Sequence, residues 1–372
     1  MMKSRFLAFL LISFMLMAAT SSITRAQDTA ATEAPALDSP FRPTDLIAIT
    51  DLFKRATVYG SPSSYKFAIV TNMLSPFWTA TAIGEQRASS ELGTSAVFIA
   101  PAKAGDIASQ QSLLETLVKD GYSGIAFSAI DPASVVSVVS DGMDQGVNFM
   151  AIDSDSPDSK RTIFIGLDNH HGGLLAGQAM VDALGNDCGQ VVGFVGLSTT
   201  QKAVDRIAGI KEAFEGKGCT LETVLDDQGD TSVAQSNSAT ALSTYPGLKG
   251  MIGIDSYNAP AAIQALKTSK HAGEVKLVAF DLPTETMQGL RDKVVSAAIG
   301  QRAYYYGYLS VYMLYAMSTI TPHETRSMLL AQLSGDKQDR LDTGADVVTP
   351  ENLDVYIEYL NSLGIAAPKL KS

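Results

Sequence analysis

Side chains that can form several hydrogen bonds recur at the ends of short apolar runs in this chain. A carboxylate or an amide follows most of these runs, one arginine stands in AVDRIAGI, and a Phe-Trp pair follows the first run. Carboxylates accept hydrogen bonds from hydroxyl groups, guanidinium and amide groups donate them, and aromatic faces cover C–H groups. This combination suits a ligand with many hydroxyl groups around a ring. The side chains at these positions are Thr71, Asn72, Phe77, Trp78, Asp153, Ser154, Arg206, Gln228, Asp255, Asp281 and Gln301.

Each of these carboxylates also has a simpler interpretation. An aspartate directly after a strand commonly caps the helix that follows. The argument for a site therefore rests on recurrence of polar strand ends, and not on any single residue.

The elements that must position these side chains follow a regular alternation. From residue 65, short apolar runs such as KFAIVT and VNFMAI alternate with longer stretches of helical periodicity. Strands that are apolar throughout and alternate with helices are typical of parallel sheets covered on both faces. Roughly ten strands in two successive series predict two α/β units. Ligands of such sheets bind outside the carboxyl ends of the strands.

Several segments, in this order, resemble the type I periplasmic sugar-binding proteins, close to the ribose-binding branch that serves ATP-driven (ABC) importers. The resemblance runs from about residue 65 to the C-terminal end. It is carried by the Thr-Asn and Pro-Phe-Trp residues of 71–78, AID (151–153), IGLDN (165–169), DRIAGI (205–210), GIDS (253–256), AFD (279–281) and AAIGQ (297–301).

The resemblance implies an α/β fold of two Rossmann-like lobes with parallel sheets, joined by a three-strand hinge. IGLDN would form the first crossing, Gln301 the second, and a third would lie near residue 343. The hinge residues would be Asp168, Asn169 and Gln301. The expected division is a signal peptide (1–26), a leader of unknown role (27–64), an N-terminal lobe (65–167 plus 302–343) and a C-terminal lobe (168–301 plus 344–372).

The same resemblance places ligand contacts at most of the strand-end residues named above, with departures from the ribose-binding pattern. Ser154 stands where ribose binders have an arginine, Ser75 where they have an asparagine, and Asp255 where they have an asparagine. These changes remove donors and add an acceptor. We therefore expect a ligand other than ribose, such as a polyol, an inositol, a different aldose or an amino-sugar derivative. We expect Trp78→Ala to reduce affinity more than stability.

The N-terminal residues predict export. Lys3 and Arg5 precede the uncharged run FLAFLLISFMLMAA, and TRA offers a cleavage site after Ala26. A removed secretory signal fits this pattern better than a spanning helix, because the run is short. We expect a periplasmic protein. Within the leader, TDLIAITDLFKRA predicts one short amphipathic helix.

Only two cysteines occur, Cys188 and Cys219, and each stands just before an apolar run. If those runs are neighbouring parallel strands, the thiols meet at one sheet edge and form a disulfide in an oxidising compartment. Two separate buried thiols are the alternative.

Composition and motifs weigh against other classes. The chain has 372 residues and a net charge of -11, and it offers no basic stripe for nucleic acid. It contains no dinucleotide-binding glycine pattern, P-loop or nucleophile elbow, so we expect neither an enzyme nor a cofactor, and no catalytic residue. The adjacent His170 and His171 cannot share a helix face, so we expect no metal site. The tyrosine-rich segment 304–315 predicts a packed helix and not a ligand platform.

The expected partners are a small sugar or polyol and the permease of an ABC transporter in the inner membrane. Presentation of the ligand to a chemoreceptor or a sensor kinase is the alternative readout. We expect a monomer.

Overall fold

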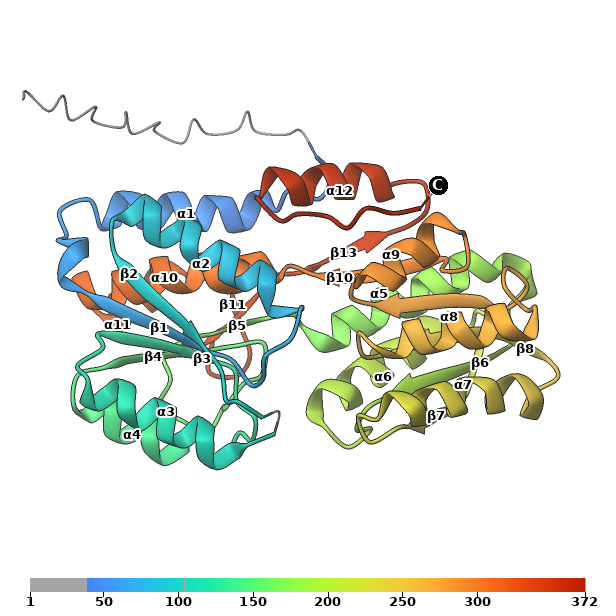
Figure 1. Ribbon diagram of the computed structural model, residues 1–372. Coiled ribbons are helices and arrows are strands. Elements are labelled where there is room, and N and C mark those ends of the chain that lie inside the picture. The colour runs from blue at the N-terminus through green and yellow to red at the C-terminus, as the bar shows by residue number, and fades with distance from the viewer. Residues whose placement is uncertain (1–38, 104, 372) are drawn as a thin grey trace, which may run out of the picture. The chain divides into compact units, whose positions relative to one another are not determined.

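The computed structural model describes residues 39–103 and 105–371. Two β-sheets, each with helices on both faces, give an α/β architecture (Figure 1). The predicted signal peptide (1–26) and the first part of the leader (27–38) lie outside the described residues.

Ten parallel strands form the core of the two sheets, and each corresponds to an apolar run predicted from the sequence. Most of their side chains are buried, as expected for strands covered on both faces. The strands are β1 (Lys66–Val70), β2 (Ser95–Ile99), β3 (Gly124–Phe127), β4 (Asn148–Ile152), β5 (Phe164–Gly166), β6 (Gln190–Val195), β7 (Thr220–Asp226), β8 (Leu248–Gly253), β9 (Lys276–Phe280) and β10 (Ala297–Gln301).

Three short strands near the C-terminal end were not predicted: β11 (Leu333–Ser334), β12 (Arg340–Asp342) and β13 (Ala345–Val348). The strand orders are β11-β12-β5-β4-β3-β1-β2 and β13-β10-β9-β8-β6-β7. Both sheets are therefore mixed and not wholly parallel, because β11 runs antiparallel to β12 and β13 antiparallel to β10. β13 runs antiparallel to β10 because the chain leaves the second sheet along β10 and re-enters it along β13.

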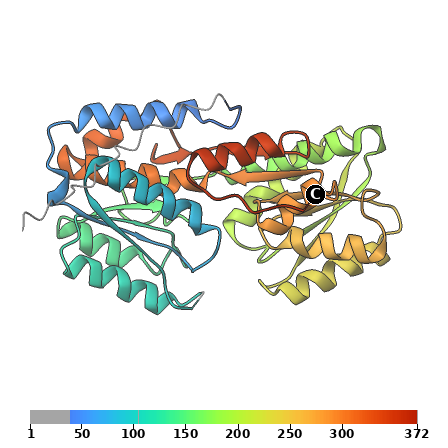
Figure 2. The same cartoon turned by 45° about the horizontal axis from the view of Figure 1, so that its top comes forward.

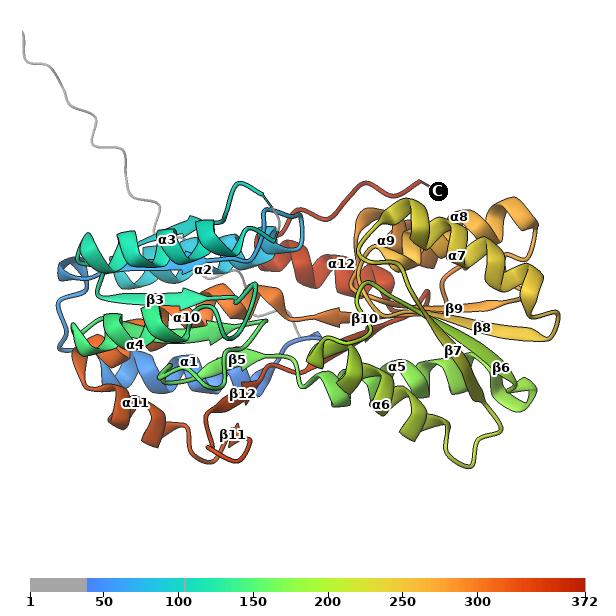
Figure 3. The same cartoon turned by 90° about the horizontal axis from the view of Figure 1, so that it is seen from below.

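Helices cover both faces of each sheet. On the first sheet, α2 and α10 lie on one face and α3 and α4 on the other (Figure 1). The second sheet lies between α5 and α6 on one side and α7, α8 and α9 on the other (Figure 3). The helices are α1 (Thr44–Ala56), α2 (Trp78–Leu92), α3 (Ile107–Lys119), α4 (Val136–Asp144), α5 (Asn169–Leu184), α6 (Gln201–Phe214), α7 (Thr231–Thr244), α8 (Asn258–Ser269), α9 (Thr284–Arg291), α10 (Ala303–Thr319), α11 (Pro322–Met328) and α12 (Leu353–Ser362), with single 3₁₀ turns at Pro62–Ser64 and Gly185–Asp187.

The tyrosine-rich segment forms α10, and its rings are mostly buried in the core of the first sheet. This confirms the prediction of a packed helix. The leader helix α1 is also confirmed, and it lies on the outer side of α10 (Figure 2). Leu46, Ile49 and Phe53 of α1 are buried in the same core. Just before α1, Phe41 packs against Tyr356 of α12, with ring centroids 5.0 Å apart. The described part of the leader is thus an integral part of the fold.

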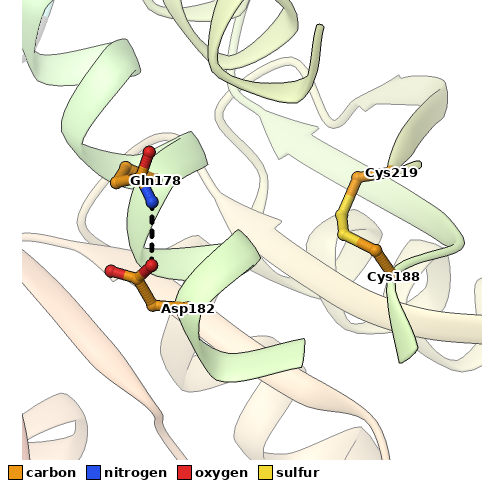
Figure 4. Close-up of a disulfide and its surroundings, with 4 residues drawn as sticks. All are labelled: Gln178, Asp182, Cys188 and Cys219. Carbon is orange, nitrogen blue, oxygen red and sulfur yellow. Dashed lines mark hydrogen bonds between the residues drawn. A yellow bond between two sulfur atoms is a disulfide. The ribbon is translucent and has the colours of Figure 1, made fainter. Parts of the chain in front are cut away.

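Cys188 and Cys219 form the predicted disulfide (Figure 4). Their Cα atoms are 4.7 Å apart. The two residues stand just before β6 and β7, which pair in parallel. The bond therefore joins neighbouring strands at their amino ends, beside α5, where Gln178 donates to Asp182 at 2.8 Å (Figure 4).

The chain passes between the two sheets three times: after β5, after β10, and between β12 and β13. Hydrogen bonds tie these passages together. Asp342 Oδ1 accepts from the backbone N–H groups of Asp168 and Gly344, both at 2.9 Å. Arg302 Nη1 donates to the carbonyl of Thr343 at 3.0 Å. The hinge residues predicted at the first two passages are Asp168, Asn169 and Gln301.

Candidate ligand site

Two of the predicted carboxylates follow strands of different sheets in an unusual backbone conformation. Asp153 follows β4 with φ of 58°, and Asp281 follows β9 with φ of 61°. Side chains other than glycine rarely adopt this left-handed region, although aspartate and asparagine tolerate it best. Such residues persist where the surrounding structure holds them, often at ligand sites. At Asp153 and Asp281 the polar strand end is therefore also a place of backbone strain.

Arg206, on α6, is held rigidly at the carboxyl edge of the second sheet. Its side chain is buried, and the whole residue is 1% exposed. Nε donates to Asn169 Oδ1 at 2.9 Å, and Nη1 donates to the carbonyl of Ile254 at 2.8 Å. The guanidinium also lies 4.1 Å from the ring centroid of Phe280. Among the described residues, this arrangement leaves Nη2 as the nitrogen without an acceptor.

Glycines explain how α6 can present Arg206 at this point. A Cβ atom on Gly173 of α5 would lie 2.1 Å from the carbonyl oxygen of Arg206. A Cβ atom on Gly209 of α6 would lie 2.1 Å from the carbonyl oxygen of His170. Both contacts are far inside van der Waals distance, so only glycine permits α5 and α6 to approach this closely. The close approach brings Asn169 of α5 within hydrogen-bonding distance of Arg206.

Asp281 is positioned by a chain of hydrogen bonds that begins on α10. The hydroxyl of Tyr306 donates to Gln301 Oε1 at 3.2 Å, and Gln301 Nε2 donates to Asp281 Oδ1 at 3.0 Å. Tyr306 thereby fixes which way the Gln301 amide points. Gln301, predicted as both a hinge and a ligand residue, is shown here as the link between α10 and the end of β9.

Burial raises the pKa of Asp281, and the charge of Asp153 raises it further. The charge of Arg206 and the hydrogen bond from Gln301 act in the opposite direction. Asp153 and Arg206, which belong to different sheets, thus both lie within electrostatic reach of Asp281. Asp153, Asp281 and Arg206 are therefore the charged side chains of the candidate site.

Asp153 receives its own donors from the first sheet. Asp153 Oδ2 accepts from the hydroxyl of Ser128 at 3.0 Å and from that of Ser154 at 3.3 Å. Ser154 therefore orients the carboxylate beside it. Ser128, which follows β3, was not among the predicted site residues.

Asp255 is fully engaged by protein donors. Oδ2 accepts from the backbone N–H of Gly196 at 2.9 Å, and Oδ1 forms an ion pair with Lys202 Nζ at 2.8 Å. Burial raises the pKa of Asp255. The charges of Lys202 and Arg206, with the hydrogen bonds from Lys202 and Gly196, outweigh this effect, so the pKa falls below its ordinary value. Sequence reasoning missed Lys202. Its place four residues before Arg206, on the same face of a predicted helix, was the available signal.

Two further carboxylates join loops of the second sheet to one another. Asp226 Oδ2 accepts from the backbone N–H and the hydroxyl of Ser198, at 2.8 and 2.9 Å. Asp227 is buried and accepts from Tyr257 at 2.6 Å and from Asn258 at 2.7 Å. These bonds connect the loop after β7 with those after β6 and β8. Some of the polar side chains at strand ends therefore stabilise loops.

Gln228 is not brought to Arg206 and Asp281. It follows β7, which is an edge strand of the second sheet. In the strand order β7 is four positions from β10, whose last residue is Gln301, and five from β13 at the other edge. Its side chain is exposed and donates to Asp226 Oδ1 at 2.7 Å. Its predicted ligand contact is therefore not supported by its placement.

The first turn after β1 also changes the predicted contacts. Thr71 is fully buried, and its hydroxyl donates to the carbonyl of Met73 at 2.9 Å. Trp78 is 3% exposed and belongs to the core of the first sheet, while its indole N–H donates to Asn72 Oδ1 at 3.3 Å. Thr71 and Trp78 thus support the loop, Trp78 from within the core, and their direct contacts with a ligand stay predictions. Phe77, packed edge-on against Trp78 with centroids 5.0 Å apart, is the partly exposed ring.

Because Trp78 is buried in the core, we now expect Trp78→Ala to reduce stability more than affinity. Trp78→Ala should lower the free energy of unfolding by about 3–5 kcal/mol, because it empties a buried site in the core. Phe77→Ala should instead weaken ligand binding with a smaller loss of stability. Urea unfolding and calorimetric titration of both variants separate the two effects. If Trp78→Ala instead has normal stability and reduced affinity, the indole contacts the ligand directly.

Three other findings on the described residues bear on function. No group of histidine, cysteine and acidic side chains in the described ranges has the arrangement of a metal site. None of the helices in those ranges is both long and apolar enough to cross a bilayer. A hollow at the opposite edge of the first sheet is lined by residues that include Tyr65, Ser123 and Asn148. That hollow lies at the amino ends of β1, β3 and β4, away from Arg206 and Asp281.

Comparison with known proteins identifies the family. The model of the periplasmic binding protein domain matches residues 67–319. The D-ribose/D-allose-binding protein of Pseudomonas aeruginosa is 27% identical over 205 residues, which cover 53% of this chain and 64% of that protein. The D-allose-binding periplasmic protein of Escherichia coli is 25% identical over 246 residues, which cover 63% of this chain and 79% of that protein. The match thus spans less than two thirds of the Pseudomonas protein.

Solved structures agree with this result. An ABC transporter solute-binding protein from Burkholderia graminis, in complex with D-arabinose, superposes with a TM-score of 0.69 at 26% identity. The match covers 79% of this chain and 98% of that one. A sugar ABC transporter sugar-binding protein from Bacillus halodurans gives a TM-score of 0.69 at 25% identity, covering 78% and 99%. The chain belongs to the periplasmic binding protein family, as the resemblance in its sequence indicated.

Proposed function

We propose that this protein captures a sugar or a related polyol at the carboxyl ends of its two sheets and delivers it to the permease of an ABC importer. The observation that carries the proposal is that the guanidinium of Arg206 packs on Phe280, the residue before Asp281, while the charges of Arg206 and Asp153 both act on Asp281. The fixed guanidinium has Nη2 available as a donor, and the carboxylates keep one oxygen each outside the bonds described above. Such a set of donors and acceptors matches vicinal hydroxyl groups.

The names of the relatives support a carbohydrate ligand. The curated relatives bind ribose, allose, xylose or arabinose by name, and the Burkholderia structure holds D-arabinose. Phe77 adds a partly exposed ring at the end of β1, suited to cover the C–H face of a sugar. The relatives carry names of binding proteins, in line with binding rather than catalysis as the role of this chain.

Binding in this proposal closes two lobes about the hinge. The N-terminal lobe comprises 65–167 and 302–343, and the C-terminal lobe 168–301 and 344–372. Because Asp153 lies on one lobe and Arg206 on the other, a ligand that bonds to both favours the closed arrangement. Export of a monomer to the periplasm, after removal of residues 1–26, completes the proposal.

A thermal-shift screen tests the proposal. The mature protein, beginning at residue 27, is heated with pentoses, hexoses, polyols, inositols and amino sugars. At least one compound should raise the melting temperature in a concentration-dependent way, because a ligand stabilises only the state that binds it. If none shifts the transition, the proposed sugar-binding function is wrong.

A separate experiment tests whether the protein delivers its ligand to a permease or presents it to a sensor. Uptake of the identified sugar by cells should fall when the gene for this protein is deleted and recover with the wild-type gene. Normal uptake in the deletion strain, together with a lost chemotactic or transcriptional response to the sugar, would instead support the sensor alternative.

A further inference from the structure

A three-residue segment after β3, residues 128–130, holds the candidate ligand residue Asp153 in place. The hydroxyl of Ser128 donates to Asp153 Oδ2, and the backbone N–H of Ala129 donates to the carbonyl of Ser154, both at 3.0 Å. The segment therefore contacts both the side chain of Asp153 and the backbone directly after it. Because Asp153 has a φ of 58°, which persists only where the surroundings hold it, these contacts bear on the geometry of the site.

The segment 128–130 is itself fixed by one buried side chain, that of Gln110 on α3. Gln110 Nε2 donates to the carbonyl of Ser128 at 2.8 Å, and Gln110 Oε1 accepts from the backbone N–H of Ile130 at 2.9 Å. Nε2 also donates to the carbonyl of Thr71, after β1, at 3.3 Å. One amide group thus holds the segment at both of its ends and joins it to the turn after β1.

The Gln110 amide is confined to one orientation. Gln110 is 1% exposed and Ser128 is fully buried, so neither has free access to water as an alternative partner. Reversing the amide would place its oxygen against two carbonyl oxygens. The other buried residues of α3, Leu114 and Leu117, are apolar, and burying an amide costs free energy unless it is bonded. Packing of α3 on the sheet therefore does not account for a glutamine at this position.

We infer that Gln110 is a positioning residue of the proposed ligand site, which sets the direction of the Asp153 carboxylate through residues 128–130. The inference rests on the proposed function, in which Asp153 bonds to a hydroxyl group of the ligand. Gln110 forms its hydrogen bonds with Thr71, Ser128 and Ile130, so its effect on Asp153 passes through the segment between them.

The test measures sugar affinity in variants that each break one step of this arrangement. Gln110→Met is similar in size to the wild-type side chain but bonds neither to the Ser128 carbonyl nor to the Ile130 N–H. Ser128→Ala removes only the hydroxyl that donates to Asp153. Leu117→Ala, on the same helix and buried in the core, is the control for lost stability. The double variant Gln110→Met/Ser128→Ala completes the set.

Calorimetric titration gives the affinity of each variant, and thermal unfolding gives its stability. The probes are D-ribose, D-allose, D-arabinose, D-xylose, D-glucose, D-galactose and myo-inositol. The probe that binds the wild-type protein most tightly is then used for all the variants.

Gln110→Met and Ser128→Ala should each lower the affinity by about tenfold, because the carboxylate is no longer held in the direction of the ligand. The double variant should lie within about threefold of the weaker-binding single variant, since both substitutions break the same connection to Asp153. Leu117→Ala should lower the melting temperature and leave the affinity within about twofold of wild type, because it only opens a cavity in the core.

Four results would overturn the inference while a sugar still binds: an affinity of Gln110→Met within about twofold of wild type, the same for Ser128→Ala, losses that multiply in the double variant, or an equal loss of affinity in Leu117→Ala. Ser128→Ala is a small change, so it tests the bond to Asp153 even if Gln110→Met does not fold. If no probe binds to the wild-type protein, the proposed function itself fails and the inference falls with it.

Discussion

Arg206→Lys should weaken sugar binding by about 2–4 kcal/mol, the largest effect that we expect from a substitution retaining charge. Lysine keeps the positive charge but cannot reproduce the fork that donates to Asn169 and to the Ile254 carbonyl while presenting a third nitrogen. The ligand would lose its fixed donor, and Asp281 would lose a neighbouring charge that offsets its burial. Calorimetric titration with the sugar found by the thermal-shift screen measures the loss.

A control separates this effect from a general disturbance of α6. Lys211 lies on the same helix and is exposed, so Lys211→Ala should leave affinity unchanged. The stability of Arg206→Lys must be measured as well, because the wild-type side chain is buried. Unchanged affinity in folded Arg206→Lys would remove Arg206 from the site.

Asp281→Asn should act in opposite directions on binding and on stability. Binding should weaken by about 2–4 kcal/mol, because the ligand loses a carboxylate acceptor. Asparagine is nearly the same size and tolerates the left-handed backbone at this position. The ligand-free variant should nevertheless be more stable than wild type at neutral pH, because a partly buried charge has been removed.

The effect of Asp281 on the free energy of unfolding should depend on pH in a known direction. Since burial raises the pKa of Asp281, the folded protein binds this proton more tightly than the unfolded chain. The contribution of Asp281 to stability therefore falls as the pH rises from about 4, the ordinary pKa, through the raised value. Urea unfolding of the ligand-free proteins should show the advantage of Asp281→Asn widening as the pH rises to 7.

Asp292 offers a control of opposite sign. A hydrogen bond from Lys267 lowers the pKa of Asp292, so its contribution to stability is present above the ordinary value and is lost as the pH falls through the lowered one. Asp292→Asn should therefore be less stable than wild type at neutral pH. An Asp281→Asn variant that loses stability in the same way would contradict the assignment of Asp281 as a strained ligand residue.

The sequence was sufficient to predict the core of the fold. Uninterrupted apolar runs such as KFAIV and KLVAF are typical of strands with helices on both faces of the sheet. Their alternation with helical stretches predicted where the core strands lie along the chain. The short strands β11, β12 and β13 were missed because two to four residues carry no readable periodicity. They depend on neighbours far away in the sequence.

The site was predicted in part, for a physical reason. Strand ends indicate the edge where ligands of such folds bind, and the charges of Asp153 and Arg206 both act on Asp281 at that edge. A sequence does not show which partner a polar side chain has already bonded. Asp255 is occupied by Lys202, and Gln228 stands on an edge strand.

The aromatic pair after β1 illustrates the same limit. Adjacent residues at the start of a helix point in different directions, so one ring of the pair is buried when the other faces outward. The sequence indicated that a ring could cover the ligand. The structure favours Phe77 and places Trp78 in the core.

The most direct test is a crystal structure of the mature protein with the sugar that most raises its melting temperature. We predict that the sugar lies at the carboxyl ends of both sheets, with hydroxyl groups within hydrogen-bonding distance of Arg206 Nη2 and of the carboxylates of Asp153 and Asp281. A sugar bound without contact to Arg206, for example in the hollow lined by Tyr65, Ser123 and Asn148, would contradict the site described here.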